Sequence, residues 1–274
     1  MSREHSFAAS IPVVSASELR LRLEQIRLSV AGPTALAFDA DGTLWSGDVG
    51  FDLFKAALAA RALRPAAREA LADEAHAAGL FVGDAEDANE IALRLFAAWA
   101  AGDVSDERAF RMMAWAFAGH GEDEMLAFAE AAQLASGLAA RLHGPVREII
   151  SWAHEADIEV WVVSASPRAA VVAGARLFDI DPKRVIGVTP LASGGVLTTE
   201  LSEPISYDAG KPLALSAAAP AVTVLAAFGD TASDVPLFLA SRQPVAVGPN
   251  ARLRAASASV HGIVELALAG ETAP

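Results

Sequence analysis

The sequence predicts an α/β fold, in which a parallel sheet carries helices on both faces and an all-α region is inserted into it. Short apolar runs of strand length recur around residues 35–38, 160–163 and 223–228. Helix-length segments alternate with strand-like runs after residue 143, as in strand–helix–strand units with right-handed crossovers. Between residue 47 and about residue 141, only helical patterns occur, separated by glycine or proline.

Composition limits the classes of protein to which the chain can belong. Its 274 residues are enough for one large domain or two smaller ones, and 53% of them are hydrophobic, many of them alanine. The net charge is −13 and the isoelectric point is about 4.8, so no basic face for nucleic acid is expected. The absence of cysteine excludes disulfides, thiolate catalysis and cysteine-ligated metals.

No stretch predicts export or a membrane partner. Met1–Ser10 lacks an apolar core flanked by positive charge, which a secretion signal requires. The longest uncharged run, Pro212–Gly229, is interrupted by Pro220 and by polar residues. A cytoplasmic protein is therefore expected, and the oligomeric state is not predicted.

The spacing of apolar residues, together with glycine and proline residues that end helices, predicts the elements before and within the insert. Ser17–Val30 has helical spacing, with Ser17 as N-cap and Gly32-Pro33 as the stop, so residues 1–33 form an N-terminal helical extension. Residues 34–47 and 142–274 form the predicted core, and residues 48–141 form a separate helical unit. Its five predicted helices are Phe51–Leu63, Pro65–Ala78, Ala85–Ala101, Ser105–Ala118 and Glu122–Leu142.

Strands and helices alternate again from His143 onward. Glycines at 194 and 195 begin a segment, Gly194–Glu200, which with Pro204–Ser206 predicts an antiparallel ribbon. The remaining predicted helices are Pro145–Ala156, Pro167–Leu177 and Lys211–Ala218, and the predicted strands are Glu159–Ser164, Val185–Val188, Thr223–Phe228 and, as the last, Val245–Val247.

Charged and hydroxyl side chains follow these strands where each one ends. In parallel sheets the carboxyl ends of the strands meet at one edge, so these side chains are expected to converge. Crowded carboxylates need a cation and suit Mg²⁺, whereas a lysine and a hydroxyl suit a phosphate. The residues concerned are Asp39, Asp41, Ser164, Lys211, Asp230 and Asp234.

Taken in order, these residues resemble the four motifs of the haloacid dehalogenase-like superfamily. The motifs are Asp39-Ala40-Asp41-Gly42-Thr43, Ser164, Lys211 and Gly229-Asp230-x-x-x-Asp234. The helical insert resembles a type 1 cap on a Rossmann-like core. The segment Pro244–Asn250, together with the predicted ribbon, is most similar to the phosphoserine phosphatase-like branch.

The resemblance implies a role for each motif residue. Asp39 would attack phosphorus and form an aspartyl-phosphate, and Asp41 would be the general acid and base. Mg²⁺ would bind Asp39, the main-chain carbonyl of Asp41 and Asp230, while Asp234 would complete the metal site or orient Lys211. Lys211, Ser164 and Thr43 would hold the phosphoryl oxygens.

The resemblance therefore implies a phosphoric monoester hydrolase that is Mg²⁺-dependent and acts on a small phosphomonoester. The dehalogenases of the superfamily have no acid at the position of Asp41, so dehalogenation is rejected. A phosphotransferase or phosphomutase would use the same core. A non-catalytic protein that docks partners on its helices is the alternative outside enzymology.

Substrate choice would belong to the cap. Asp48 is a candidate for receiving a substrate ammonium or is a carboxylate at a helix entry, and Arg111 is a candidate for a substrate carboxylate. Trp45 is placed to line the pocket or to pack in the core. A phosphorylated amino acid or amino alcohol is the expected substrate class, and hinges are expected near 46–50 and 142–145.

Overall fold

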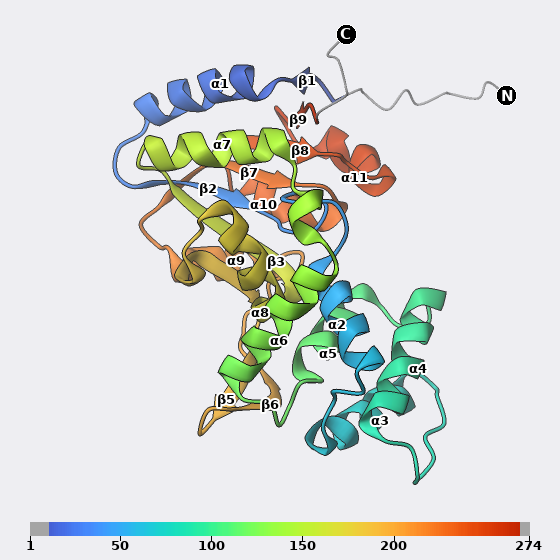
Figure 1. The fold of residues 1–274 in the computed structure, drawn as a ribbon. Helices are drawn as coiled ribbons and strands as arrows, with labels where there is room; N and C mark the ends of the chain where they lie inside the picture. The colour runs from blue at the N-terminus through green and yellow to red at the C-terminus, as the bar shows by residue number, and fades with distance from the viewer. Residues whose placement is uncertain (1–10, 269–274) are drawn as a thin grey trace, which may run out of the picture. The chain divides into compact units, whose positions relative to one another are not determined.

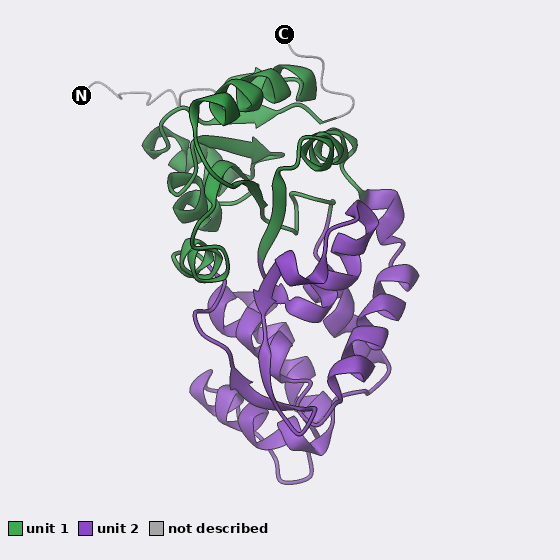
Figure 2. Cartoon of the chain, turned by 90° about the vertical axis from the view of Figure 1, so that its left-hand side faces the viewer, with its two compact units in different colours: residues 1–46, 142–163, 208–274 green, residues 47–141, 164–207 purple. Residues whose placement is uncertain are grey.

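The computed structural model describes residues 11–268, which form two compact units (Figure 2). Unit 1 contains the described residues up to Ser46, Leu142–Val163 and those from Asp208 onward. Unit 2 contains Gly47–Arg141 and Ser164–Tyr207. Two of the unit boundaries, after Ser46 and after Arg141, fall at the predicted hinges. Met1–Ser10, for which no secretion signal is predicted, lies outside the described residues.

A seven-stranded parallel sheet confirms the predicted α/β class (Figure 1). The order of the strands across the sheet is β1-β9-β8-β7-β2-β3-β4. Strand β2 lies inside the sheet, between β7 and β3, so the residue that follows it has a strand end on each side. The strands are β1 (Val13–Val14), β2 (Thr34–Phe38), β3 (Glu159–Pro167), β4 (Val185–Val188), β7 (Thr223–Gly229), β8 (Gln243–Val247) and β9 (Val264–Leu266).

Helices cover both faces of the sheet in unit 1. Helix α1 (Ala16–Ser29) packs against α7 (Gly144–Glu155) and β7, as Figure 1 shows. Helix α10 (Val235–Leu239) contacts β7, β8 and α9 (Gly210–Ala218), and α11 (Ala251–Ala256) follows β8. Within residues 11–268, no helix combines the length and the apolar composition that a membrane crossing needs.

The start of α1 differs from the predicted N-cap at Ser17. Ser15 is the N-cap: its hydroxyl accepts from the Glu18 N–H (3.2 Å), and the Glu18 carboxylate accepts from the Ser15 N–H (2.8 Å). This reciprocal capping box satisfies two N–H groups at the helix end, which a cap at Ser17 would leave unpaired.

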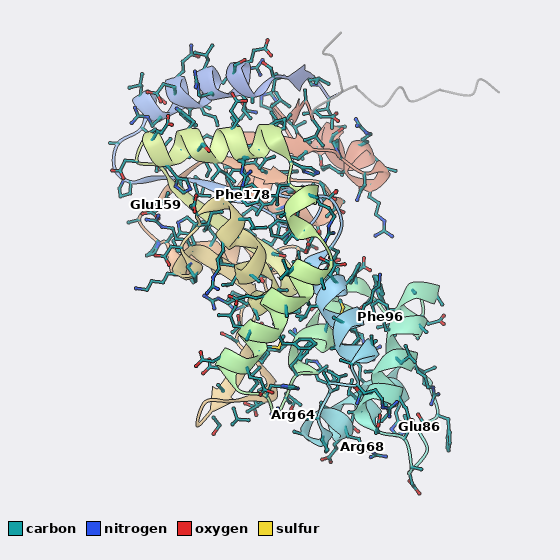
Figure 3. The ribbon with its side chains drawn as sticks, viewed as in Figure 1. Arg64, Arg68, Glu86, Phe96, Glu159 and Phe178 are labelled. Atoms are coloured by element: carbon teal, nitrogen blue, oxygen red, sulfur yellow. The ribbon has the colours of Figure 1, made fainter. Side chains whose placement is uncertain are left out.

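Unit 2 contains the predicted helices of the insert, and the described part of the insert has no strand. Helix α4 starts at a capping box between Asp87 and Glu90, and it ends at Gly102, whose φ of 88° only glycine adopts readily. Phe51, Phe96 and Trp99 pack ring against ring inside the unit, and Figure 3 labels Phe96. The helices are α2 (Val49–Ala59), α3 (Arg68–Ala77), α4 (Ala88–Ala101), α5 (Asp106–Trp115), α6 (Glu122–Ala135) and, from the chain after β3, α8 (Arg168–Ala175).

The antiparallel ribbon exists, but its predicted partner segment was wrong. Strand β5 (Pro190–Ser193) pairs with β6 (Val196–Leu201), and residues 204–206 form no strand. Gly194 and Gly195 both have positive φ, so they form a tight two-residue turn that pairs β6 with the strand before it.

Two short strands, β1 at the edge of the sheet and β9 next to it, are absent from the prediction. Strand β9 follows Val245–Val247, which was predicted to be the last strand, and it pairs with β1 from the N-terminal extension. Each has only two or three residues, too few to show an alternating pattern. The extension therefore adds a strand to the sheet as well as a helix.

Two aromatic rings join β2 to β7 at the ends of these strands. Phe38 and Phe228 are fully buried and stack with their ring centroids 4.1 Å apart. Each of them directly precedes a carboxylate motif, Phe38 by one residue and Phe228 by two. The stack therefore fixes the strand ends from which both motifs emerge.

Replacing Phe38→Ala is expected to lower the free energy of unfolding by about 3–5 kcal/mol, because it leaves a cavity against Phe228. Urea denaturation followed by circular dichroism measures the change. Leu28→Ala is the control, since Leu28 is 74% exposed, and it should change stability by no more than about 0.5 kcal/mol. Similar losses in the two variants would contradict the role of the stack.

Candidate active site

The site in unit 1 is built around Asp39, the residue that follows β2. Its main-chain N–H donates to the carbonyl of Phe228 in β7 (2.9 Å), which continues the ladder by one residue. The residue is buried, with 5% of its surface exposed. Asp39 is therefore held rigidly at the carboxyl ends of two paired strands, where α/β sheets bind their ligands.

Lys211 reaches Asp39 from 172 residues further along the chain. It lies in the first turn of α9 and is 2% exposed. Its Nζ donates to Oδ1 of Asp39 (2.6 Å) and to Oδ1 of Asp234 (2.5 Å). One buried ammonium thus links the motif after β2 to the motif after β7.

Asp234 uses both carboxylate oxygens within the protein. Oδ1 accepts from Lys211, and Oδ2 accepts from the main-chain N–H groups of Asp230 (3.1 Å) and Thr231 (3.0 Å). The side chain is fully buried. This arrangement suits the orienting role among the two roles expected for Asp234, because its oxygens already hold the lysine and the loop.

Gly42 brings the two carboxylate motifs into direct contact. Its φ is +76°, and a Cβ placed on it would lie 2.4 Å from Oδ2 of Asp230. Any other residue would be strained in this conformation and would displace the Asp230 carboxylate. The glycine in the first motif is therefore required by the close approach of Asp230.

The charges at this site do not balance. Burial raises the pKa of Asp39 well above its ordinary value; Lys211 opposes this, and Asp234, Asp230 and Asp41 add to it. Burial and the charge of Asp234 raise the pKa of Asp230 to about 7. Burial alone would lower the pKa of Lys211, but Asp234 and Asp39 outweigh it and raise that pKa. The carboxylates of Asp39, Asp41, Asp230 and Asp234 thus lie near a single ammonium, that of Lys211.

These residues fit a divalent metal ion. One carboxylate oxygen from each of Asp39, Asp230 and Asp234 lies within 4.8 Å of the others. The donor atoms are oxygens only, the ligand type that Mg²⁺ prefers, and the excess negative charge favours a cation. Asp39 and Asp230 would hold the ion directly, since Asp234 already has its partners.

Thr43 presents a polar atom without a partner. It is fully buried, and within residues 11–268 its Oγ1 has no hydrogen-bond partner. A buried hydroxyl left unpaired is unfavourable, so the atom is suited to an incoming ligand. Its main-chain carbonyl accepts from Nδ1 of His143 (2.9 Å), and His143 also donates its N–H to the Leu44 carbonyl (3.0 Å).

The contacts of Trp45 and His143 were not predicted. Trp45 is fully buried, and its indole N–H donates to Oδ1 of Asp41 (2.9 Å). None of the histidines showed a motif in the sequence, and His143 lies 100 residues from Thr43, so no local pattern indicates the contact. Trp45 lies only four residues after Asp41, so its contact with that residue could have been predicted from their closeness in the sequence.

Ser164, Asp48 and Arg111 belong to unit 2, and their roles stay predictions. Ser164 is buried; its Oγ accepts from the Ser166 N–H (3.1 Å) and its carbonyl accepts from the Ser206 hydroxyl (2.6 Å). Asp48 is the N-cap of α2 and accepts from the Phe51 N–H (2.8 Å). Arg111 lies 3.8 Å from Glu107 and 3.4 Å from Glu203, so two carboxylates already offset its charge.

The metal-free protein is expected to lose stability as the pH rises from about 4 toward 8. Asp230 has a higher pKa in the folded state than in the unfolded state, so between the two values the folded state binds more protons and stability falls with pH. Asp230→Asn should weaken this slope, and Glu155→Gln, an exposed carboxylate on α7, should not. Thermal denaturation in chelator from pH 5 to pH 8 measures it. Equal slopes in Asp230→Asn and the unmutated protein would contradict the assignment.

The chain matches a known protein family over most of its length. The family model described as haloacid dehalogenase-like hydrolase matches residues 36–239. No curated protein matches the chain.

Several solved structures share the fold. A protein of unknown function from Bordetella pertussis Tohama I has a TM-score of 0.63 and 21% identity, covering 86% of this chain and 99% of its own. A HAD family hydrolase from Salmonella enterica subsp. enterica serovar Typhi has a TM-score of 0.54 and 14% identity, covering 93% and 77%. A phosphoserine phosphatase in the form of a phospho-aspartyl intermediate analogue has a TM-score of 0.50 and 14% identity, covering 87% and 95%. Because this family model matches more than half of the chain, over a region that contains both carboxylate motifs, the chain belongs to the haloacid dehalogenase-like hydrolase family.

Proposed function

We propose that this protein is a Mg²⁺-dependent phosphatase that hydrolyses a small phosphomonoester through an aspartyl-phosphate on Asp39. The observation that carries the proposal is the group of Asp39, Asp230 and Asp234, of which Asp39 and Asp234 are buried and Asp230 is half-buried, around a lysine that contacts two of them. A protein that only binds partners would gain nothing from such crowded negative charge, which destabilises the folded state. A phosphoryl-transfer site needs it to position a cation and a phosphate.

In the first half-reaction, an oxygen of Asp39 bonds to phosphorus while the ester P–O bond breaks. Asp41 gives its proton to the departing oxygen, so the alcohol leaves neutral and Asp41 becomes a carboxylate. The ammonium of Lys211 offsets the negative charge of the transferring phosphoryl group. Asp234 holds that ammonium in place through its Oδ1.

In the second half-reaction, Asp41 takes a proton from water. The water oxygen bonds to phosphorus as the bond between phosphorus and Asp39 breaks. Inorganic phosphate leaves, and Asp39 and protonated Asp41 are restored. Each proton that Asp41 donates is recovered, so one residue serves as acid and then as base.

Supporting groups complete the proposed site. When bound, Mg²⁺ supplies positive charge to the phosphoryl oxygens and favours ionised Asp39. The unpartnered Oγ1 of Thr43 would donate to a phosphoryl oxygen, and Ser164 is proposed for the same task. The substrate class is a phosphorylated amino acid or amino alcohol, with Asp48 and Arg111 as candidates for its charged groups. We also propose that the protein is cytoplasmic, that residues 34–47 and 142–274 form the catalytic core, and that residues 48–141 form the cap.

Asp39→Asn is expected to reduce phosphate release by at least about a thousandfold, because an amide cannot act as the nucleophile. Circular dichroism should show an unchanged fold. Glu155→Gln is the matched control and should retain full activity. Intact mass after acid quenching should show one phosphoryl group on the unmutated protein and none on Asp39→Asn. Phosphorylation of the variant would contradict the assigned nucleophile.

Phosphate release from small phosphomonoesters is expected with Mg²⁺ and should be absent in chelator. A panel that includes phosphoserine, phosphocholine and 2-aminoethyl phosphate tests the class. Release without an added acceptor or bisphosphate separates a phosphatase from a phosphotransferase or phosphomutase. No Mg²⁺-dependent release from any ester in the panel would reject the proposal.

A further inference from the structure

The indole of Trp45 is anchored where the chain leaves and re-enters unit 1. Its side chain is fully buried, and its backbone forms an isolated β-bridge with Leu142. The adjacent residues Leu44 and His143 are joined by a main-chain hydrogen bond (3.0 Å). The ring therefore has little freedom to move, and its N–H points at a fixed place, Oδ1 of Asp41, 2.9 Å away.

The chemistry of indole restricts what Asp41 can do. An indole N–H donates and cannot accept, so the oxygen it contacts must offer a lone pair. The carbonyl oxygen of a carboxylic acid is a stronger acceptor than its hydroxyl oxygen, so the contact favours the proton on the other oxygen, Oδ2, when Asp41 is protonated. An aspartic acid without such a contact would distribute its proton over both oxygens and several rotamers, and Trp45 shifts this distribution toward Oδ2.

We propose that Trp45 is a positioning residue for general acid catalysis, a proposal that rests on the phosphatase function above. Trp45 keeps Oδ1 of Asp41 as an acceptor so that the proton is delivered from Oδ2. As the ester P–O bond breaks, the O–H bond at Oδ2 breaks and a new O–H bond forms on the departing oxygen. The resulting carboxylate stays hydrogen-bonded to the indole, which stabilises its charge. In the second half-reaction, Oδ2 takes the proton from water.

Proton delivery matters most when the leaving group is a poor one. Benzyl phosphate and 4-nitrophenyl phosphate have similar size, but their leaving groups have pKa values of about 15 and about 7, so the first needs a proton far more. Trp45→Phe should lower kcat/KM for benzyl phosphate by about 10–100-fold and for 4-nitrophenyl phosphate by less than about threefold. The ratio kcat/KM is the right measure because it reports the step in which the alcohol leaves.

Two comparisons separate positioning from general stability. Trp161→Phe removes another mostly buried indole donor in unit 1, which bonds Oε2 of Glu159 on β3 (2.7 Å; Figure 3 labels Glu159), and it should affect both substrates equally. In an Asp41→Asn background, Trp45→Phe should cause no further loss on benzyl phosphate, because the proton donor is already absent. Replacing Trp45 by 3-benzothienylalanine, which keeps the ring size and has sulfur in place of N–H, gives the same test if the phenylalanine variant does not fold.

Equal losses on the two substrates, or a further loss in the Asp41→Asn background, would overturn the positioning role and leave the phosphatase proposal intact. Unmutated protein that releases no phosphate from either ester with Mg²⁺ would overturn the proposed function and the positioning role together.

Discussion

The ammonium of Lys211 between Asp39 and Asp234 is the interaction on which the site depends. The three residues come from α9, from the end of β2 and from the loop after β7, so one side chain ties three elements together. Removing a buried ion pair from water is unfavourable, and such pairs add little net stability. Its value lies in the chemistry: it keeps a lysine charged next to the proposed nucleophile. The remaining excess of negative charge creates the need for a cation.

Much of the site follows from the sequence because its residues lie at the ends of strands with strong apolar patterns. Runs such as Thr223–Phe228 predict buried parallel strands, and parallel strands bring their carboxyl ends to one edge. That rule alone predicts that Asp39, Asp230 and Asp234 meet. Lys211 was expected at the same edge, but its contacts were not, since nothing local to α9 shows that its side chain is buried.

Other features could not be predicted because they depend on contacts distant in sequence or on very short segments. Strands β1 and β9 are defined by pairing with each other and with β8, and their few residues have no pattern of their own. The contact of His143 with Thr43 depends on how the insert ends. The grouping of Ser164–Tyr207 with the inserted helices depends on packing, which strand–helix alternation does not reveal.

The paired residues at the ends of the insert have an evolutionary consequence. Trp45 and Leu142 pair directly, and Leu44 bonds His143, so the chain departs from and rejoins the sheet unit at one point. The entropic cost of closing a loop rises only slowly with its length. The segment between these residues can therefore lengthen, shorten or be exchanged while the strand register is kept. Descendants of one catalytic framework can therefore acquire new specificities by replacing this segment as a module.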